Sequence, residues 1–413
     1  MKTASVISIG NELLDGQTVD TNAAYLGSEL MSLGIPVISR FTVGDDLDKI
    51  VRVLGLACED SEVVLVTGGL GPTADDLTRQ GLAQFMGVEL RLDQGLLRTL
   101  TEFFAHRGWA MSQVNKIQAC LPVGAEAILN ALGTAPGILA RRQGRIIAAM
   151  PGVPFEMKGM FSQSIAPLLA EFRAGQAVAV RHLQCFGEGE SMIAERISPM
   201  MDRGRNPQVN TTVHEGIVSL HVIAAAGDAA EAERLADCDV EVLRSKLGPL
   251  VFALGDQTLA SVVGDLLASR GKTLAVAESC TGGLIAKMLT DLAGASQYLL
   301  CGWVVYSNEA KIRDLGVPPD LLQEHGAVSR ETAAAMARGA RLRAQADCAI
   351  AITGIAGPAG GTPDKPVGLV FISVDDSRGG TLTERFQFTR DRQFIRQRAA
   401  NTALNMLRQR LAL

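Results

Sequence analysis

Two short turns contain the residues of this sequence that could do chemistry. Residues 67–76 read TGGLGPTADD, and residues 277–283 read AESCTGG. Each turn follows a run of small apolar residues and precedes apolar residues at helical spacing, so we expect each to lie where a strand passes into a helix. Glycine allows a close backbone approach, and the free N–H groups of a helix start favour an anion. Both turns are therefore candidate phosphate sites.

The first turn also carries two neighbouring carboxylates, Asp75 and Asp76. Carboxylates beside a phosphate can hold a divalent cation that bridges the phosphate oxygens. The turn is neither a GxGxxG fingerprint nor a P-loop, because no GK[ST] closes it. The alternative is a structural turn in which Asp75 or Asp76 caps the following helix. The spacing alone leaves both interpretations open.

The second turn sets Ser279 beside Cys280, and three interpretations compete for it. Ser279 or Thr281 can cap the following helix. Thr281, Gly282 and Gly283 can cradle a phosphate at the helix start. Ser279 or Cys280 can act as a nucleophile. We expect one of the two hydroxyls to cap the helix whichever of the other roles applies.

A nucleophilic serine needs a base, and the sequence offers a lysine rather than a histidine. His325 is the only histidine in residues 256–413, and no motif surrounds it. Residues 304–315 read VVYSNEAKIRDL, which predicts Tyr306 at a strand end and Lys311 one turn into the next helix. A lysine of lowered pKa or a tyrosine–lysine relay could activate the serine. The alternative is a packed aromatic side chain beside an ordinary surface lysine.

Bulk composition indicates the class of protein that must position these residues. The chain has 413 residues, 47% of them hydrophobic but only 4% aromatic, and 43 glycines. These values favour two or three α/β domains with aliphatic parallel strands. The net charge of −5 argues against a general nucleic-acid binder. Seven cysteines without a CxxC pair indicate neither a zinc site nor a disulfide framework. The absence of long apolar runs predicts a cytoplasmic protein with no membrane span.

Alternation along the chain predicts two α/β domains joined by a small α+β module. Strands and helices alternate from residue 5 to residue 86, which is typical of a parallel sheet with crossover helices. The pattern changes at residue 177 to two alternating strands (178–185 and 216–226) flanked by helices, and α/β alternation resumes at residue 258. A third glycine-rich strand exit follows Thr353, so three exits could meet at one sheet edge. We place the domains at residues 1–172, 173–255 and 256–413.

The N-terminal motifs resemble a known family. TGGLGPTADDLT resembles the signature of the molybdopterin-binding fold, and ISIGNELLDGQTVDTNAAYLGSELMSLGI, FTVGDD, NALGTAPG and MPGVPFEMKGM resemble the CinA (competence/damage-inducible) family. The resemblance covers essentially the whole chain. It implies that the N-terminal domain hydrolyses ADP-ribose to AMP and ribose 5-phosphate with a divalent metal (Mg, Mn or Co). It also implies substrate contacts from Gly68, Gly69, Gly71, Thr78, Asn130 and residues 151–154, and metal contacts from Asp45, Asp75 and Asp76.

The C-terminal motifs AESCTGG, VVYSNEAKIRDLGV and TGIAGPAGG resemble nicotinamide mononucleotide deamidase, the C-terminal half of CinA. This resemblance implies hydrolysis of the carboxamide to nicotinic acid mononucleotide and ammonia, without a cofactor. It assigns Ser279 as nucleophile, Tyr306 and Lys311 as activating groups, and Cys280 as a bystander. It assigns Thr353 as a further catalytic residue that binds or polarises the nucleotide, and it assigns contacts with the nucleotide to Thr281, Gly282, Gly283, Gly354 and Arg392.

One departure from the family pattern concerns the phosphate. A Gly-Asp-Arg is expected near the last helix, and this chain has Arg390–Asp391–Arg392. The sequence therefore leaves open whether Arg390, Arg392 or Arg396 contacts the nucleotide phosphate.

The resemblance implies a bifunctional enzyme of pyridine-nucleotide recycling that forms a homodimer. The charge and the lack of long apolar runs predict that it binds neither nucleic acid nor membrane. Two alternatives stay open. The N-terminal domain could bind or adenylylate molybdopterin, or the chain could be a non-enzymatic accessory of DNA uptake or repair.

Overall fold

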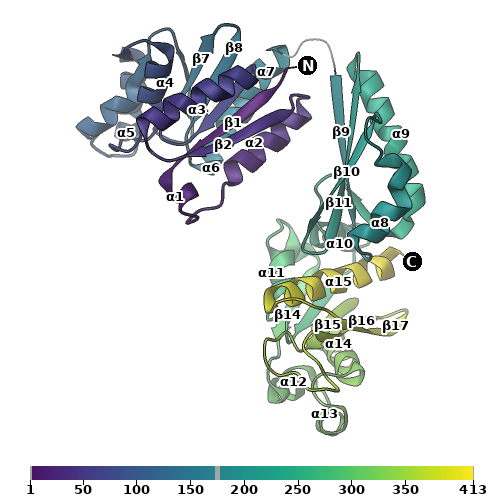
Figure 1. Ribbon diagram of the computed structural model, residues 1–413. Helices are drawn as coiled ribbons and strands as arrows, with labels where there is room; N and C mark the ends of the chain where they lie inside the picture. The colour runs from purple at the N-terminus through teal and green to yellow at the C-terminus, as the bar shows by residue number, and fades with distance from the viewer. Residues whose placement is uncertain (1, 173–176, 413) are drawn as a thin grey trace. The chain divides into compact units, whose positions relative to one another are not determined.

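The N-terminal part of the chain is built on a six-stranded sheet in this computed structural model, which describes residues 2–172 and 177–412 (Figure 1). The strand order is β2-β1-β3-β8-β7-β6; the first four strands are parallel, β7 is antiparallel to β8, and β6 is antiparallel to β7. The strands are β1 (Ala4–Ile9), β2 (Val37–Val43), β3 (Val63–Thr67), β6 (Glu126–Ile128), β7 (Gly137–Arg142) and β8 (Arg145–Met150). The helices are α1 (Asn11–Leu14), α2 (Thr21–Ser32), α3 (Leu47–Asp60), α4 (Thr78–Met86), α5 (Gln94–His106), α6 (Pro154–Met160) and α7 (Ala166–Phe172). A small pair, β4 (Leu90–Leu92) and β5 (Cys120–Pro122), lies apart.

Helices cover both faces of this sheet. Alternate residues of β1 point to opposite sides, so that Ile7 packs with α3 and α4 while Val6 packs with α2 and α6. Because both faces are buried, the strands read as continuous aliphatic runs. The order β2-β1-β3 creates a topological switch point between β1 and β3, where open α/β sheets bind ligands beyond the carboxyl ends of the strands.

The middle module contains more strands than the sequence predicts. Its sheet has the order β10-β11-β9-β12, formed by β9 (Ala177–Cys185), β10 (Gln208–His214), β11 (Ile217–Ala226) and β12 (Val251–Leu254). Its helices are α8 (Glu190–Ile197) and α9 (Ala229–Leu247). The prediction of two strands missed β10, whose mostly exposed, polar residues lack an alternating pattern. It also did not include β12, which pairs antiparallel with β9.

The C-terminal domain repeats the switch-point arrangement. Its sheet order is β14-β13-β15-β16-β17, with β13 parallel to β14 and β15, β16 antiparallel to β15, and β17 antiparallel to β16. The strands are β13 (Leu274–Glu278), β14 (Leu299–Val304), β15 (Cys348–Gly354), β16 (Leu369–Asp376) and β17 (Gly380–Gln387). The helices are α10 (Leu259–Ser269), α11 (Leu284–Thr290), α12 (Asn308–Leu315), α13 (Pro319–His325), α14 (Arg330–Ala344) and α15 (Arg392–Ala412). One core lies under α10, α11 and α15 and another under α12, α13 and α14 (Figure 1).

Internal contacts divide the chain into two units, one reaching Val180 and including Ala224–Leu235, the other formed by Arg181–Ile223 and the chain from Ala236 onward. The predicted boundary at residues 172 and 173 adjoins residues 173–176, which lie outside the described residues. No helix in the described ranges combines the length and apolarity that a bilayer span requires.

Candidate active sites

The glycine turn of the first unit is organised by its own residues. Gly68 and Gly69 have φ of 102° and 63°, a region open to glycine, and they carry the chain from β3 toward α4. The Asp76 carboxylate accepts hydrogen bonds from the N–H of Gly71 (2.7 Å), from the N–H of Thr73 (2.9 Å) and from the Thr73 hydroxyl. Asp76 therefore closes the turn on itself. The alternative in which Asp75 or Asp76 caps α4 is wrong in its cap, because Leu77 occupies the cap position and no side chain caps it.

A buried arginine that the sequence did not single out lies beneath this turn. Arg79 is fully buried in the first turn of α4, and its guanidinium donates to the carbonyls of Leu70 and Gly71. Burial lowers its pKa to about 10, and the nearby Asp76 carboxylate opposes that shift. The predicted ligand Thr78 is also engaged, since its hydroxyl donates to the Gly68 carbonyl at 2.7 Å. These side chains shape the turn rather than point outward from it.

Carboxylates gather at the open side of the turn. Asp45 exchanges hydrogen bonds with Asn11, and burial raises the pKa of Asp45, to which Asp75, Glu12 and Asp76 add repulsion. Within residues 2–172 and 177–412, no group of three or more His, Cys, Asp or Glu residues is arranged to hold a metal ion. The predicted three-carboxylate metal centre is therefore not assembled in advance. Mg²⁺ is usually held by one or two carboxylates together with substrate phosphates, and Asp45 and Asp75 fit that chemistry.

A hollow of about 110 Å³ lies at the switch point between β1 and β3, lined among others by Thr67, Gly68 and Gly152. Asn22, which sequence reasoning missed, borders it from the start of α2. The amide nitrogen of Asn22 donates to the Thr67 hydroxyl (3.0 Å) and to the Gly152 carbonyl (2.8 Å). The signal that could have found it is Asp20, which caps α2 and so fixes the helix start at this edge.

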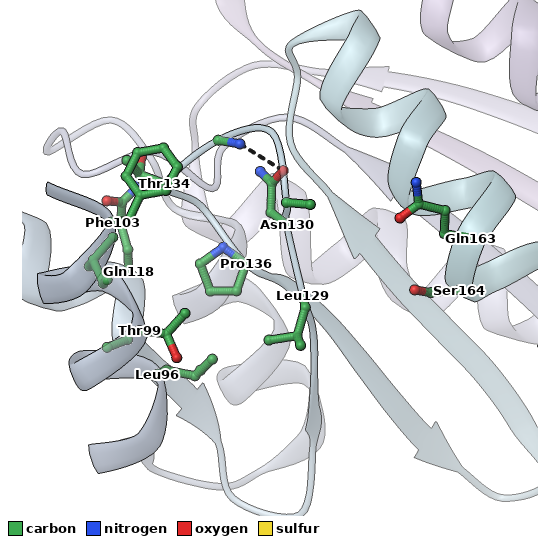
Figure 2. Close-up of a pocket in the computed structure, with 14 residues that line it drawn as sticks. Leu96, Thr99, Phe103, Gln118, Leu129, Asn130, Thr134, Pro136, Gln163 and Ser164 are labelled. Carbon is green, nitrogen blue, oxygen red and sulfur yellow. Dashed lines mark hydrogen bonds between the residues drawn. The ribbon is translucent and has the colours of Figure 1, made fainter. Parts of the chain in front are cut away.

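The side chain of Asn130, a predicted substrate contact, makes its hydrogen bonds mainly within its own loop. Its Oδ1 accepts the N–H groups of Leu132 and Gly133, and its Nδ2 donates to the Ala135 carbonyl and to Glu156. Figure 2 shows it beside Pro136 in a separate, mainly apolar cavity of about 400 Å³. The lining of the switch-point hollow does not include Asn130.

The serine turn of the second unit brings a nucleophile and an amine together. Ser279 follows β13, and its N–H is bonded to the Ile352 carbonyl of β15 (3.0 Å). Lys311 Nζ lies 3.2 Å from Ser279 Oγ and also donates to the carbonyls of Val305 (2.9 Å) and Tyr306 (3.3 Å). Lys311 is only 1% exposed, and burial lowers its pKa. The contact therefore joins a serine hydroxyl to an amine that is unusually easy to deprotonate.

Local capping explains the position of Lys311. The Ser307 hydroxyl accepts the N–H of Ala310 and starts α12, which aims Lys311 back at the strand end. The structure does not bring the Tyr306 hydroxyl to this contact. Strand β14 ends at Val304, so Tyr306 lies beyond it, 62% exposed, and its hydroxyl accepts from Arg392 at 3.1 Å.

A buried carboxylate, not a hydroxyl, caps α11. The Glu278 carboxylate oxygens accept hydrogen bonds from the N–H groups of Ile285 (3.1 Å) and Ala286 (2.9 Å). The residue at the cap position, Gly283, has no side chain that could accept them. The predicted hydroxyl cap is wrong because Gly282 and Gly283, with φ of 62° and 91°, reverse the chain toward Glu278. Two N–H groups of the helix start, those of Ile285 and Ala286, are thus already occupied by Glu278.

Cys280 and Thr281 are enclosed by the same turn. Burial raises the pKa of the Cys280 thiol to about 12, which disfavours the thiolate that a nucleophilic cysteine requires. The Thr281 hydroxyl is fully buried and makes no hydrogen bond to the described parts of the chain. His325, the histidine that a triad would need, instead lies near Glu324 and Glu331.

The remaining predicted residues surround the turn from β15 and α15. The Thr353 hydroxyl donates to the Ala327 carbonyl (2.6 Å), and Gly354 lies so close to β16 that a Cβ would come within 2.7 Å of the Leu369 carbonyl. Arg392 donates to the Gly357 carbonyl (2.8 Å). Arg396 grips the Thr281 carbonyl with two nitrogens, at 2.6 and 3.1 Å.

Arg390 precedes α15 in a left-handed conformation, with φ of 90° and its guanidinium over the Phe394 ring. Of the three arginines left open by the sequence, Arg396 touches the serine turn itself, Arg392 touches the neighbouring loop, and Arg390 packs on its own helix.

Three segments of the chain match known families. Residues 5–171 match the "Probable molybdopterin binding domain", residues 180–253 the "Damage-inducible protein CinA KH domain", and residues 256–411 the "CinA C-terminal domain". Together with the fold, these matches define a mixed α/β protein with a molybdopterin-binding-like N-terminal domain and a CinA C-terminal domain.

Full-length relatives extend this assignment. The chain is 43% identical over 412 residues to a CinA-like protein of Geobacter sulfurreducens, covering 100% of this chain and 99% of that protein. It is 40% identical over 408 residues to a CinA-like protein of Kosmotoga olearia, covering 99% and 98%. The chain therefore belongs to the CinA family.

Proposed function

We propose that the second unit is an amidase that hydrolyses the carboxamide of nicotinamide mononucleotide to nicotinic acid mononucleotide and ammonia. The observation that carries the proposal is the buried Lys311 Nζ lying 3.2 Å from Ser279 Oγ. The motif resemblance supplies the substrate. Amide hydrolysis requires an activated nucleophile and a group that can return a proton to the leaving nitrogen, and a neutral lysine can perform both tasks.

The reaction follows from this pair. Ser279 Oγ attacks the carboxamide carbon as its proton passes to neutral Lys311, which gives a tetrahedral intermediate. The carbon–nitrogen bond then breaks, the lysine proton goes to the leaving nitrogen, and ammonia departs, leaving the nicotinate acyl group on Ser279. Water attacks this ester and gives a proton to Lys311. The carbon–oxygen bond breaks, and the proton returns to Ser279 with release of the acid.

Ammonia release tests this function directly. The full chain incubated with nicotinamide mononucleotide is expected to release one ammonia for each nicotinic acid mononucleotide formed. The Ser279→Ala variant, which should fold because a hydroxyl is simply removed, is the matched blank. Folded wild-type protein that releases no ammonia would refute the proposal.

We propose that the first unit hydrolyses the pyrophosphate of ADP-ribose to AMP and ribose 5-phosphate with a divalent metal. Two observations support it: Asp75 and Asp76 lie close enough to Asp45 to repel its charge, and Gly68 of the glycine turn lines the switch-point hollow. Asp45 and Asp75 would hold the ion, which when bound would neutralise charge on the pyrophosphate. The backbone of residues 68–71 would bind the phosphate oxygens, and Arg79 would keep that backbone in place. AMP formation with Mg²⁺, Mn²⁺ or Co²⁺ tests the proposal, and molybdopterin adenylylation without AMP release from ADP-ribose would favour the alternative.

We further propose that the protein acts as a homodimer without binding nucleic acid. A KH module clamps a nucleic-acid backbone with a GXXG loop, and residues 177–254 have no two glycines at that spacing. Sedimentation velocity tests the dimer. A gel shift at moderate salt tests the second part, and a stable complex with DNA or RNA would restore the accessory role.

A further inference from the structure

Helix α15 connects the serine turn to the middle module. Arg396, in its second turn, grips the Thr281 carbonyl of the serine turn. Arg398 points away from that contact, because residues two apart on a helix lie roughly 200° apart around its axis. Its guanidinium donates to the carbonyl of Gly216, in the hairpin turn between β10 and β11. Both contacts lie within the second unit.

The contact between Arg398 and the hairpin is enclosed and shaped for it. The Arg398 guanidinium lies 4.3 Å from the centre of the Phe186 ring, a cation–π arrangement, and burial lowers its pKa. Gly216 has φ of 78°, and a Cβ there would come within 2.0 Å of an Arg398 nitrogen. The neighbouring Glu215 carbonyl accepts from Asn401, one helical turn further along α15.

Module and C-terminal domain also share one hydrophobic core. Phe186, Phe252 and Ala253 of the module pack in the same cluster as Ile395 and Ala399 of α15. The helix is therefore held on one side by the module and on the other by the serine turn. A displacement of α15 on the module side must reach the serine turn, because Arg396 and Arg398 belong to the same rigid helical turn.

We propose that Arg398 and the hairpin residue Gly216 are positioning residues of the amidase site, holding α15 so that Arg392 and Arg396 stand correctly for the nucleotide. The inference rests on the amidase function proposed above. Ser279 and Lys311 are fixed by β13 and α12 rather than by α15. Loss of the hairpin contact should therefore weaken nucleotide binding and leave the chemical step largely intact.

Steady-state kinetics of the full chain with nicotinamide mononucleotide test this split. Arg398→Met keeps the apolar stem over Phe186 and removes the hydrogen bond. We expect it to raise KM about tenfold with kcat changed by less than about twofold. Arg398→Lys, which keeps the cation, should recover part of the loss.

The matched control is Arg408→Met. Arg408 lies on the same helix and also donates to a carbonyl of the module, that of Pro249 at 2.8 Å, but it lies three turns beyond the site. It should leave KM within about twofold of wild type, because the hydrogen bonds of Arg408 within the described residues go to Asn405 and Pro249 and not to the serine turn. Equal effects of Arg398→Met and Arg408→Met on KM would show a general loss of docking and overturn the proposal.

Gly216→Ala approaches the same contact from the hairpin. It should raise KM as Arg398→Met does, and the double variant should be no worse than either single variant, since both remove one contact. Additive effects on KM would contradict the inference.

Hydrogen exchange separates this inference from the proposed activity. Peptides covering residues 280–290 should exchange faster in Arg398→Met than in Arg408→Met, whether or not the wild type releases ammonia. Inactive wild-type protein with this difference would refute the amidase and retain the coupling. Active wild-type protein in which the two variants exchange equally would support the amidase and refute the coupling.

Discussion

The glycine turn of the first unit and the serine turn of the second both lie at the carboxyl end of a parallel strand, the first after the flanking strand β3 and the second after the central strand β13, and they are completed differently. Both follow a strand of a three-strand arrangement with the same order, β2-β1-β3 and β14-β13-β15. The glycine turn satisfies its polar groups with Asp76 and Arg79, a few residues away. The serine turn receives its buried amine from Lys311, 32 residues further along the chain.

This difference suits the glycine turn to binding a ligand and the serine turn to reacting with one. A turn closed by its own aspartate and arginine has no free nucleophile, so any chemistry there depends on what binds to it. In the serine turn, the buried Glu278 caps the helix, and the Ser279 hydroxyl is in contact with the Lys311 amine. Similar glycine-rich strand exits thus support different chemistry according to which side chain the next element delivers.

The largest expected effect is that of Ser279→Ala. Removal of the nucleophile should lower kcat for ammonia release by at least about ten-thousandfold. Cys280→Ala should keep most of the activity, because the buried thiol with its raised pKa does not form a thiolate near neutral pH. Assays of both variants on the same substrate check the pair, and the reverse result would transfer the chemistry to the cysteine.

The next largest effect on ammonia release is expected for Lys311→Met. Loss of the base should lower kcat by about a hundredfold to ten-thousandfold, since a methionine fills the space without accepting a proton. The pH profile of kcat/KM gives the sign. Neutral lysine is the active form, so activity should fall as pH drops through the lowered pKa of Lys311. If the pKa of Lys311 were that of an ordinary lysine, the same fall in activity on acidification would begin at a higher pH. A profile that stays flat on the acid side would exclude Lys311 as the base.

Asp76 and Asp45 of the first unit should have different roles, Asp76 in the stability of the glycine turn and Asp45 in the chemistry. Asp76→Ala removes three hydrogen bonds and should destabilise the turn by about 1–3 kcal/mol. Asp45→Asn should not destabilise it. The pKa of Asp45 is raised in the folded chain, so its ionisation as pH rises opposes folding, and an asparagine removes that opposition.

Both variants should lose metal-dependent AMP formation, but only Asp76→Ala should accelerate hydrogen exchange in residues 67–78. If Asp45→Asn accelerated exchange to the same extent, the two carboxylates would share one structural role.

The sequence predicted strands and helices well where apolar periodicity was strong, and it missed what long-range packing decides. The contact of Ser279 with Lys311 could be anticipated, because both were expected at strand exits of one sheet. The cap by Glu278 could not, since it depends on two positive-φ glycines folding the helix start back over the strand end. Strand β10 was missed because its residues face solvent and its place is fixed only by pairing with β11.

The smallest expected effect is that of Arg390→Gly, and it sharpens the question of which arginine serves the phosphate. Arg390 has φ of 90°, where a side chain costs about 1–2 kcal/mol and glycine costs nothing sterically, although glycine adds freedom to the unfolded chain. Arg390→Gly should therefore raise the free energy of unfolding by less than about 1 kcal/mol, measured by denaturant titration. Because its guanidinium packs on Phe394 while Arg396 grips the serine turn, KM should stay within about twofold of wild type, whereas Arg396→Met should raise it about tenfold or more. A larger rise in KM for Arg390→Gly would mean that this strained conformation is maintained to present a cation to the nucleotide, and the phosphate contact would then belong to Arg390.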